Sequence, residues 1–454
     1  MNIPYFFRIT VLISILLLNY PPGFAQPVGE KTSHHQAYLL TEANLIPQIS
    51  QKGNSTLSGS LDRYEFTPIL LTKNQNTSMT SFAIRAGEGK DFHYRYQMVD
   101  SSWSSWISLA GFHEKNPFDR AFISELVFLP EQAQAIQLRE QTKATSYDPL
   151  IQLDVFTPEK MAQAELQRMP SEGACDCVIP EYVDRIGWGS PDGLDPSCPN
   201  IAYVPVTHMI VHHTVNNNSI TDWQAAVFSI WNFHVNTNNW CDLGYNWLID
   251  PNGVLYEGRG GGDNVRGAHF CGRNGGTMGI AMLGTFTDVA PTEEALTTLK
   301  GILAWKSCKS NINPLSNSLH TTSNLVLAHI SGHRDGCSTL CPGDSLYSRL
   351  SGIRQDVQDL TMECLLTTAL DIDESDKGLT ISPNPFEHTL SIKLPQQAKV
   401  HSLIIRDIQG KRLWTSSNTS LKEITLSTDS WPRGIYIMES LSDSFSEFKK
   451  VIKL

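Results

Sequence analysis

The sequence predicts a multidomain fold: a central α/β domain, with a mixed β-sheet flanked by helices, between an N-terminal β-sandwich-like domain and a C-terminal Ig-like β-sandwich. Three observations lead to this fold class. The length of 454 residues suits about three domains of roughly 150 residues each. All nine cysteines lie between Cys175 and Cys364, which marks out one domain. Strand and helix patterns alternate only in that part, whereas the flanking parts show the period of two that half-buried strands require.

The charge and composition exclude one class of partner. A net charge of −11 lacks the basic footprint that phosphate binding requires, so we expect no nucleic-acid partner. With 41% hydrophobic and 18% charged residues, the composition is typical of a soluble protein.

Residues 1–25 have the pattern of an export signal. Arg8 precedes an apolar run at 9–18, and small residues at 23 and 25 suit cleavage after Ala25. The run is too short to span a bilayer; the alternatives are an uncleaved anchor or a buried strand. We therefore expect a protein with no stable membrane span, exported through the periplasm and secreted or held at the cell surface.

The N-terminal domain is predicted at residues 60–157, after a loose polar leader at 26–58. Bulky and polar residues alternate at 92–98 and again at 103–109, on either side of a turn at 100–102, which is typical of antiparallel strands. Further strands are expected at 135–139 and 151–156. The tryptophans at 103 and 106 are interpreted as core residues, with a sugar-binding face as the alternative.

A linker is expected at 158–178, followed by the central domain at 179–365. The elements expected in this domain are strands at 206–211, 245–249, 254–257, 279–284 and 325–328, helices at 221–235, 292–308 and 344–360, and a hairpin turn at 250–253.

Residues 327–344, LAHISGHRDGCSTLCPGD, hold the first candidate chemistry. His333 and Cys341 are eight residues apart, and imidazole and thiolate are ligands that zinc favours. A third ligand must come from elsewhere, and His212 and His213 at the end of a predicted strand are the candidates. Neighbouring strand residues point to opposite faces, so only one of the two can serve, and the pattern does not say which.

Two alternatives stay open for this stretch. Cys341 could pair with Cys337 instead of binding a metal, although the loop between them is tight. If Cys341 does bind a metal, the other eight cysteines suffice for four disulfides, whose pairing is not readable from the sequence. His329 precedes His333 by one helical turn, but Ser331 and Gly332 break a helix there, so His329 is not expected to be a ligand.

Five separated motifs in one order carry a family resemblance. They are VHHT at 211–214, WCDLGYN at 240–246, YEGR at 256–259, GAH at 267–269 with Asn274, and GHRD at 332–335 followed by TLCPGD at 339–344. This run resembles the peptidoglycan recognition protein and N-acetylmuramoyl-L-alanine amidase type 2 family. The resemblance covers about 180 residues. The bulky and polar alternation ahead of it is similar to β-domains found before bacterial amidase domains.

The resemblance implies a function and a set of site residues. It implies a zinc hydrolase (one Zn²⁺ ion) that cleaves the amide between N-acetylmuramic acid and L-alanine in peptidoglycan or muropeptides. The implied roles are metal ligands at His212, His333 and Cys341, catalysis at Tyr245 and Thr339, and substrate binding at His269 and Asn274. Tyr245 and Thr339 are expected to donate hydrogen bonds to the developing oxyanion.

Departures and alternatives accompany this prediction. Some members of the family lack the ligand cysteine and only bind peptidoglycan, so its presence here predicts an enzyme; the alternative is a non-catalytic peptidoglycan-binding or surface adhesion protein. Gly272, Arg273 and Gly275 depart from the pairs that mark peptide preference, which leaves that preference open. Arg334 and His234 are expected to be structural, and Asp335 is as plausible as a cap as it is in catalysis.

The C-terminal part is predicted to be a separate domain at 379–454, after a charged linker at 366–378. Its motifs are SPNPF at 382–386, IRDIQGK at 405–411, RGIY at 433–436 and KKVIK at 449–453. Together they resemble the C-terminal sorting domain of the type IX secretion system, with a plain Ig-like binding module as the alternative. The resemblance implies the type IX secretion machinery as a partner.

Overall fold

The structure is a computed structural model, and it divides into two compact units. The first contains Met1–Arg168, Pro180–Lys300 and Leu315–Ile353, and the second contains Met169–Ile179, Gly301–Pro314 and Arg354–Leu454. The described residues are 34–41, 44–46, 62–73, 75–87, 91–112, 121–142, 151–167, 178–194, 196, 198–370, 379–394, 400–407, 412–416, 422–442 and 446–454. The expected export signal at 1–25 lies outside these ranges, as do residues 168–177 of the first expected linker and 371–378 of the second. Residues 366–370 of the second expected linker belong to the last helix of the central part, which ends at Leu370.

Two antiparallel sheets form the N-terminal domain. One consists of β1 (His35–Leu40), β10 (Ile151–Phe156), β4 (Ser81–Ala86), β7 (Phe122–Ile123) and β8 (Val127–Phe128). The other consists of β2 (Asp62–Glu65), β9 (Ala133–Thr142), β5 (Asp91–Met98), β6 (Ile107–Leu109) and β3 (Ile69–Leu70). Both sheets contribute to one apolar core, with Phe82 and Leu153 from the first and Phe92 and Ile136 from the second.

The N-terminal domain differs from its prediction in two respects. Strand β1 pairs with β10 along its whole length, so part of the expected polar leader belongs to the sheet. Trp103 and Trp106 are only partly buried and do not belong to the core. Instead, the guanidinium of Arg95 lies 4.7 Å and 4.6 Å from their ring centres, an arrangement of cation–π contacts on the sheet surface.

The central domain is built on a mixed six-stranded sheet, in the order β11 (Tyr182–Val183), β14 (Leu255–Glu257), β13 (Trp247–Ile249), β15 (Thr277–Met282), β12 (His208–His213) and β18 (Ile330–Gly332). Only the β13–β14 pair is antiparallel, and Gly253 with φ of +81° makes the turn between them. Strand β12 lies between two parallel neighbours, and all six of its residues are buried, as is typical of a central strand in a sheet that is covered on both faces.

The remaining elements of the central part are α1 (Trp223–Asn232), the π-helical turn η3 (Phe233–Thr237), α2 (Glu293–Lys309), β16 (Asn317–His320), β17 (Leu325–Ala328), the 3₁₀ turn η4 (His333–Asp335), α3 (Asp344–Tyr347) and α4 (Leu350–Leu370). The predicted strand at 325–328 forms a hairpin with β16, and it is β18 that joins the main sheet. Among the described residues, no helix has the length and apolarity needed to cross a bilayer.

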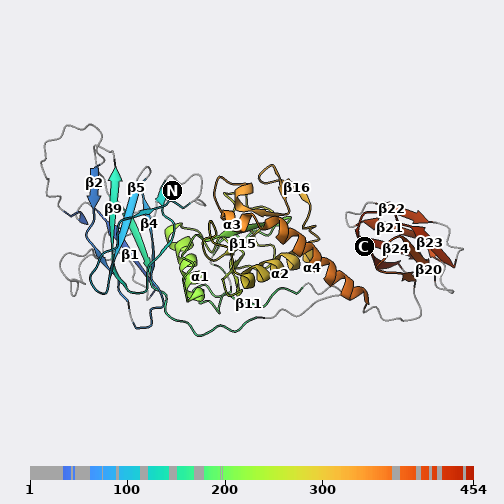
Figure 1. Cartoon of the computed structure of the whole chain (residues 1–454), viewed down its shortest axis with the longest axis horizontal. Coiled ribbons are helices and arrows are strands. Elements are labelled where there is room, and N and C mark those ends of the chain that lie inside the picture. The colour runs from blue at the N-terminus through green and yellow to red at the C-terminus, as the bar shows by residue number, and fades with distance from the viewer. Residues whose placement is uncertain are drawn as a thin grey trace. The chain divides into compact units, whose positions relative to one another are not determined.

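Helix α1 packs against both the central sheet and the N-terminal domain (Figure 1). Asp222 caps the helix by accepting a hydrogen bond from the backbone N–H of Ala225 at 3.0 Å. The apolar cluster around α1 includes Leu248 of the central sheet and also Leu126 and Phe128 of the N-terminal domain. The two regions therefore share an apolar core within the first unit.

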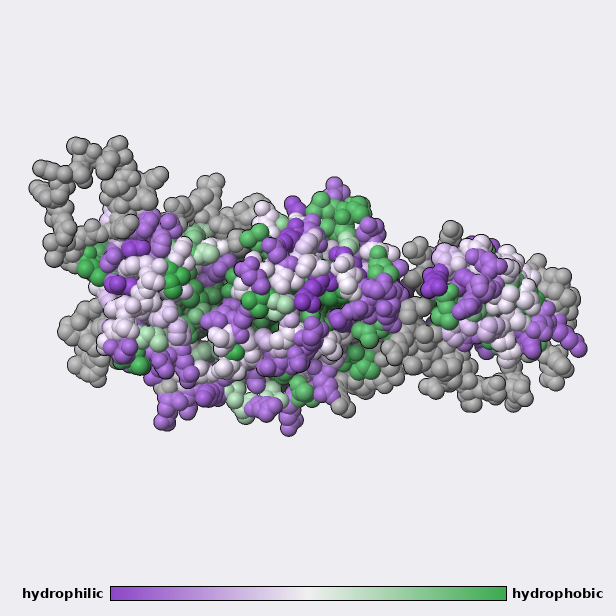
Figure 2. All heavy atoms as spheres, viewed as in Figure 1, coloured by the Kyte–Doolittle hydropathy of each residue, from purple (hydrophilic) through white to green (hydrophobic). Residues whose placement is uncertain are grey.

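The C-terminal domain has its own two sheets. The first consists of β19 (Thr380–Ser382), β20 (Thr389–Lys393) and β23 (Glu423–Ser427), and the second of β22 (Arg412–Ser416), β21 (Val400–Asp407), β24 (Gly434–Ser442) and β25 (Ser446–Lys453). Leu390, Leu403 and Val451 bring both sheets into one core. Polar and apolar residues are mixed on the face of the molecule that Figure 2 shows.

Candidate metal centre and active-site cavity

The ends of two parallel strands bring three zinc-type donors together. Val211 of β12 pairs with Gly332 of β18, so His212 and His333 follow in register, with ring centres 4.5 Å apart. The loop at 333–341, called the motif loop below, brings Cys341 back to the same point, where its Sγ lies 3.7 Å from His212 Nδ1. One donor atom from each of His212, His333 and Cys341 lies within 4.8 Å of the others, and all three residues are buried.

This donor set fits a zinc ion. Two imidazoles and one thiol are a common protein ligand set for zinc, with a fourth position for water in catalytic sites. Ligand bonds of about 2.0 and 2.3 Å in a tetrahedron place nitrogen and sulfur donors roughly 3.5 Å apart. The spacing of 3.7 Å between His212 and Cys341 agrees with that value.

His269 lies directly behind His212. A hydrogen bond of 3.0 Å joins His212 Nε2 to His269 Nδ1, and His269 Nε2 lies 3.3 Å from Thr277 Oγ1. Thr277 in turn donates to the carbonyl of Asn274 at 3.0 Å. Gly279 makes room for this ring, because a Cβ at that position would lie 2.5 Å from it. The arrangement orients the His212 imidazole.

The two residues expected to bind substrate, His269 and Asn274, lie next to each other. His269 is fully buried. The side-chain oxygen of Asn274 accepts hydrogen bonds from the backbone N–H groups of His269 and Phe270, at 2.7 and 2.8 Å. Asn274 thus holds the backbone at His269, and the binding of substrate by these two residues stays a prediction.

The other histidines considered from the sequence have different surroundings. The Nδ1 of His213 accepts a hydrogen bond from the backbone N–H of Phe286 at 3.2 Å. His329 Nε2 lies 3.0 Å from Ser318 Oγ, and its ring contacts His208 at 5.4 Å. His234 Nδ1 accepts from the backbone N–H of Gly244 at 3.2 Å. Neither His213 nor His329 belongs to the donor cluster.

Hydrogen bonds and a disulfide shape the motif loop. Asp335 accepts from the backbone N–H of Gly332 at 2.8 Å, which makes it a cap, and Arg334 forms an ion pair with Asp344 at 2.6 Å. Cys337 is bonded to Cys271, so the alternative pairing of Cys337 with Cys341 does not occur. Thr339 Oγ1 accepts from the backbone N–H of Cys341 at 3.1 Å, which leaves the hydroxyl proton for another acceptor.

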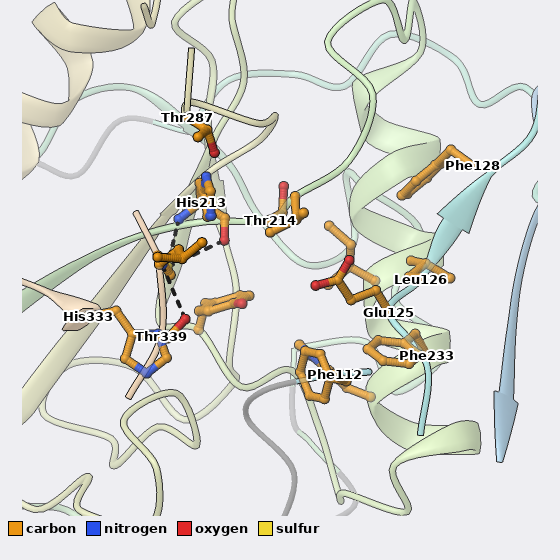
Figure 3. Close-up of a pocket in the computed structure, with 16 residues that line it drawn as sticks. Phe112, Glu125, Leu126, Phe128, His213, Thr214, Phe233, Thr287, His333 and Thr339 are labelled. Carbon is orange, nitrogen blue, oxygen red and sulfur yellow. Dashed lines mark hydrogen bonds between the residues drawn. The ribbon is translucent and has the colours of Figure 1, made fainter. Parts of the chain in front are cut away.

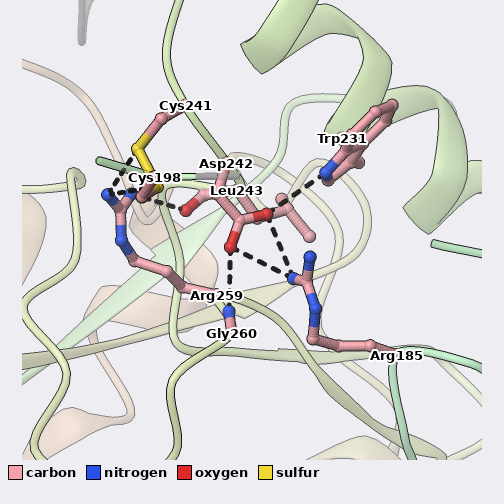
Figure 4. Close-up of a disulfide and its surroundings, with 8 residues drawn as sticks. All are labelled: Arg185, Cys198, Trp231, Cys241, Asp242, Leu243, Arg259 and Gly260. Atoms are coloured by element: carbon pink, nitrogen blue, oxygen red, sulfur yellow. Dashed lines mark hydrogen bonds and ion pairs between the residues drawn. A yellow bond between two sulfur atoms is a disulfide. The ribbon is translucent and has the colours of Figure 1, made fainter. Parts of the chain in front are cut away.

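A buried charge network holds the loop that leads to Tyr245 (Figure 4). Arg185 and Asp242 form a fully buried ion pair at 3.0 Å, and the indole of Trp231 on α1 donates to Asp242 at 3.1 Å. The Cys198–Cys241 disulfide precedes Asp242 directly. Because a buried pair with several hydrogen bonds resists displacement, this network fixes the path of the chain into Tyr245.

Tyr245 lies beside the donor cluster. Its ring centre is 5.2 Å from that of His212, and its carbonyl accepts from the backbone N–H of Arg259 at 2.8 Å. Tyr245 and Thr339 line the same cavity as His333 and Cys341. The structure therefore brings the expected ligands and the expected catalytic residues to one place.

The cavity, of about 160 Å³, has walls from two domains (Figure 3). The central domain supplies the metal-side wall together with Phe233 and His234 of η3. The opposite wall comes from the N-terminal domain and consists of Phe112, Glu125, Leu126 and Phe128. In Figure 3 the carboxylate of Glu125 points into the space between α1 and the wall that carries His213 and Thr339.

Burial favours the neutral form of His212 and His269. It lowers the pKa of His212 to about 3, with the neighbouring His213 adding to the effect, and it lowers the pKa of His269 well below its ordinary value. Neutral imidazoles are the form that binds metal ions. Burial also raises the pKa of Glu125 in the N-terminal wall.

The N-terminal wall is the part of the site that sequence reasoning missed. Phe112, Leu126 and Phe128 stand outside every motif, and Glu125 is more than 85 positions before the first ligand. The short strands β7 and β8 around Glu125 give little periodic pattern. Residues 121–129 are rich in apolar side chains, but the core of an independent small domain would show the same feature. The sequence therefore does not indicate that this segment faces the site.

Comparisons with known proteins show the family of this chain. A family model described as N-acetylmuramoyl-L-alanine amidase matches residues 202–344. Peptidoglycan recognition protein 1 of Bos indicus is 32% identical over 199 residues, which are 42% of this chain and 92% of that protein. The chain therefore belongs to the family of peptidoglycan recognition proteins and N-acetylmuramoyl-L-alanine amidases.

Two further matches have partial coverage. The human N-acetylmuramoyl-L-alanine amidase is 31% identical over 206 residues; the match covers 44% of this chain and only 33% of that protein. Among solved structures, wild-type Drosophila PGRP-LB is 27% identical, covering 37% of this chain and 92% of that one, with a TM-score of 0.31.

A second family model, described as a secretion system C-terminal sorting domain, matches residues 380–454. The C-terminal domain is thus a type IX sorting domain, which indicates delivery to the cell surface or beyond.

Proposed function

We propose that this protein is a secreted zinc-dependent amidase that hydrolyses the bond between N-acetylmuramic acid and L-alanine in peptidoglycan or muropeptides. The observation that carries the proposal is the convergence of His212, His333 and Cys341 beside a cavity that His333, Cys341, Tyr245 and Thr339 line. In this proposal an N-terminal export signal leads the chain into the periplasm, and the type IX machinery, through the Ig-like C-terminal domain, carries it across the outer membrane.

His212, His333 and Cys341 would hold the ion, and His269 would hold His212. If His212 binds through Nδ1, which faces Cys341, its Nε2 carries the proton and donates to His269 Nδ1. His269 must then be protonated on Nε2, which donates to Thr277. Each donor in this chain meets an acceptor, so one tautomer satisfies the whole arrangement.

Tyr245 and Thr339 would act on the scissile carbonyl. Zinc, when bound, supplies a Lewis acid and an acidified water. As the carbonyl oxygen gains charge, the Tyr245 phenol and the Thr339 hydroxyl donate hydrogen bonds to it, each worth ~3–4 kcal/mol in comparable sites. The backbone N–H of Cys341 donates a hydrogen bond to Thr339 Oγ1, which turns the Thr339 hydroxyl proton away from the loop. The low-dielectric lining of Phe112 and Phe233 strengthens these interactions.

The test is hydrolysis of a defined muropeptide, followed by mass spectrometry of the products. We expect free stem peptide beginning with L-alanine and intact sugar, and loss of cleavage with a chelator and in Cys341→Ser. Binding without cleavage by the zinc-loaded wild-type chain would favour a non-catalytic recognition protein. Cleavage by Cys341→Ser equal to wild type would rule out the proposed ligand set.

A further inference from the structure

The motif loop takes part in a second group of metal-type donors. Donor atoms of Cys271, His333 and Cys337 all lie within 4.8 Å of one another, as do those of His212, His333 and Cys341. His333 is the residue that the two groups share. In the structure Cys271 and Cys337 form a disulfide, so the second group can bind a metal ion only when these two sulfurs are thiols.

Hydrogen bonds keep the three donors close without help from the disulfide. The backbone N–H of Cys337 donates to the carbonyl of His333 at 3.2 Å, so both side chains belong to one tight turn. The loop that carries Cys271 is joined to this turn by Arg273, whose Nη1 donates to the carbonyl of Gly336 at 3.1 Å. The loop and the turn should therefore stay beside each other when the sulfur–sulfur bond is open.

Packing also fixes the position of the turn at His333. The fully buried ring of Phe270 has its centre 6.0 Å from that of His333. A Cβ at Gly336 would lie 2.1 Å from the Phe270 ring, so a glycine lets the turn lie directly on it. Cys337 packs against the same apolar cluster as Phe270. Because this ring is fixed in the core, the cysteine side chains, rather than the backbone, adjust when the disulfide opens.

Two thiolates and one imidazole favour a thiophilic divalent ion. Thiolates bind zinc at about 2.3 Å, so in a tetrahedron two of them lie roughly 3.8 Å apart. That spacing is within the 4.8 Å that encloses the donors of Cys271, His333 and Cys337. The second group offers two thiolates where the first offers one, and soft ions prefer thiolate ligands. The reduced pair is therefore expected to compete with the first group for the ion.

We propose that Cys271, Cys337 and His333 form a second metal site, which exists only in the dithiol state of the chain and takes a thiophilic divalent ion such as zinc, cadmium or cobalt. Binding replaces the two thiol protons with the ion and releases them to solvent. Oxidation closes the site. The two thiolates give two electrons to a disulfide-donating oxidant, which is reduced to two thiols, while the Cys271–Cys337 bond forms and the ion and His333 are released.

The shared imidazole couples the two groups. An ion held by the cysteine pair uses His333 and leaves the first group with His212 and Cys341. Every chain passes through the dithiol state before its disulfide forms, so each chain reaches the complete first group only after oxidation of the pair. The second site itself does not depend on the proposed function; the consequence that oxidation switches on hydrolysis rests on it.

The experiment uses the full chain with Cys341→Ser, which removes the thiol of the first group. Cobalt binding is followed through its thiolate-to-metal charge-transfer absorption, in the oxidised chain and after reduction with a phosphine. The two sulfurs of the disulfide gain two electrons and two protons, and the phosphine becomes phosphine oxide with an oxygen atom from water. We expect reduction to produce the absorption of one cobalt ion bound by two thiolates. Absence of this absorption from the reduced chain, folded or not, would overturn the site.

Further substitutions in the Cys341→Ser chain identify the ligands. Cys271→Ser should abolish the absorption that reduction produces. Cys198→Ser is the matched control and should keep it, because the Cys198–Cys241 pair (Figure 4) belongs to no such donor group among the described residues. His333→Gln should weaken cobalt binding at least about 100-fold, since loss of an outer-shell partner alone costs about 10–100-fold. Equal absorption in the Cys271→Ser and Cys198→Ser chains, or its loss from both, would overturn the assignment.

X-ray absorption of the wild-type chain tests the competition for His333. With half an equivalent of zinc per chain, we expect one sulfur ligand in the oxidised form and two in the reduced form. One sulfur in both forms would show that the ion stays in the first group, which would contradict the competition. These readouts need no hydrolysis. A chain that gains two sulfur ligands on reduction but cleaves no muropeptide would therefore remove the proposed function and leave the second site in place.

Discussion

The two β-domains that flank the central domain look alike in sequence, and they differ in the structure. Each consists of two sheets around an apolar core. The core of the C-terminal domain is drawn from its own residues, between Leu379 and Val451. The N-terminal domain places Leu126 and Phe128 in the cluster around α1 and supplies one wall of the metal-side cavity. An alternating pattern predicts the inner face of a sheet, but it does not predict which outer surface docks on a neighbour.

The largest expected effect comes from removing each flanking domain in turn. Deletion of residues 34–167 would expose apolar side chains of α1 and η3 such as Phe228 and Phe233, at a cost of about 1.5–3 kcal/mol for each large side chain. We expect that variant to lose cooperative thermal unfolding and muropeptide cleavage. Deletion of residues 379–454 should leave both unchanged. A chain lacking 34–167 with wild-type Tm and kcat/KM would show that the N-terminal wall is dispensable.

The next effect tests the metal-side wall. Tyr245→Phe should lower kcat by about 10²–10³, because one oxyanion donor is lost, while bound zinc stays at one ion per chain. Tyr182→Phe is the control, since Tyr182 lies in β11 and does not line the cavity. Metal analysis beside steady-state kinetics makes the check. Loss of zinc in parallel with activity would assign Tyr245 a structural role instead.

A smaller effect is expected behind the metal ligands. His269→Leu removes the acceptor for His212 Nε2 and should weaken zinc binding about 10–100-fold, measured by competition with a chromogenic chelator. His269→Asn places an amide oxygen near the position of Nδ1 and should recover part of this affinity. Equal zinc affinity in all three proteins would mean that the hydrogen bond does not orient His212.

The smallest effect concerns acid stability of the central domain. Burial, with smaller contributions from His320 and His329, lowers the pKa of His208 from 6.5 to about 4. The unfolded chain therefore binds a proton near pH 6.5 that the folded chain excludes until about pH 4, so this part of the stability is present above pH 6.5 and is lost as the pH falls toward 4. His208→Asn should reduce the number of protons taken up on unfolding in this window by about one. Measured Tm values should therefore fall less steeply with decreasing pH in the variant than in the wild type. Identical slopes in the two proteins would contradict the lowered pKa.

Much of the metal-side site could be predicted from the sequence because it lies at strand ends. The apolar run of β12 is followed by His212 and His213, and the spacing of His333 and Cys341 indicated a ligand loop. The choice of His212 over His213 came from the family resemblance. The predicted strand at 325–328 is present, but it pairs with β16 in a hairpin, and the three-residue β18 is the strand that pairs with β12. Three residues carry too little periodicity to be detected.

The N-terminal wall could not be predicted, for a different physical reason. Leu126 and Phe128 have the same apolar character whether they fill their own domain's core or a shared one. The choice depends on the shape match with α1 and on contacts between distant positions, such as Asp154 with Thr237. The pairing of Cys337 with Cys271 was undetermined for a similar reason, since it depends on the spatial proximity of two loops.

Anomalous diffraction at the zinc edge, from crystals of the zinc-loaded protein, tests the central claim most directly. The account predicts one peak at about 2.0–2.3 Å from donor atoms of His212, His333 and Cys341, in the cavity that Tyr245, Thr339 and the N-terminal wall enclose. A peak bound by His213 or His329, or full occupancy of zinc at any other position with this cluster empty, would contradict it.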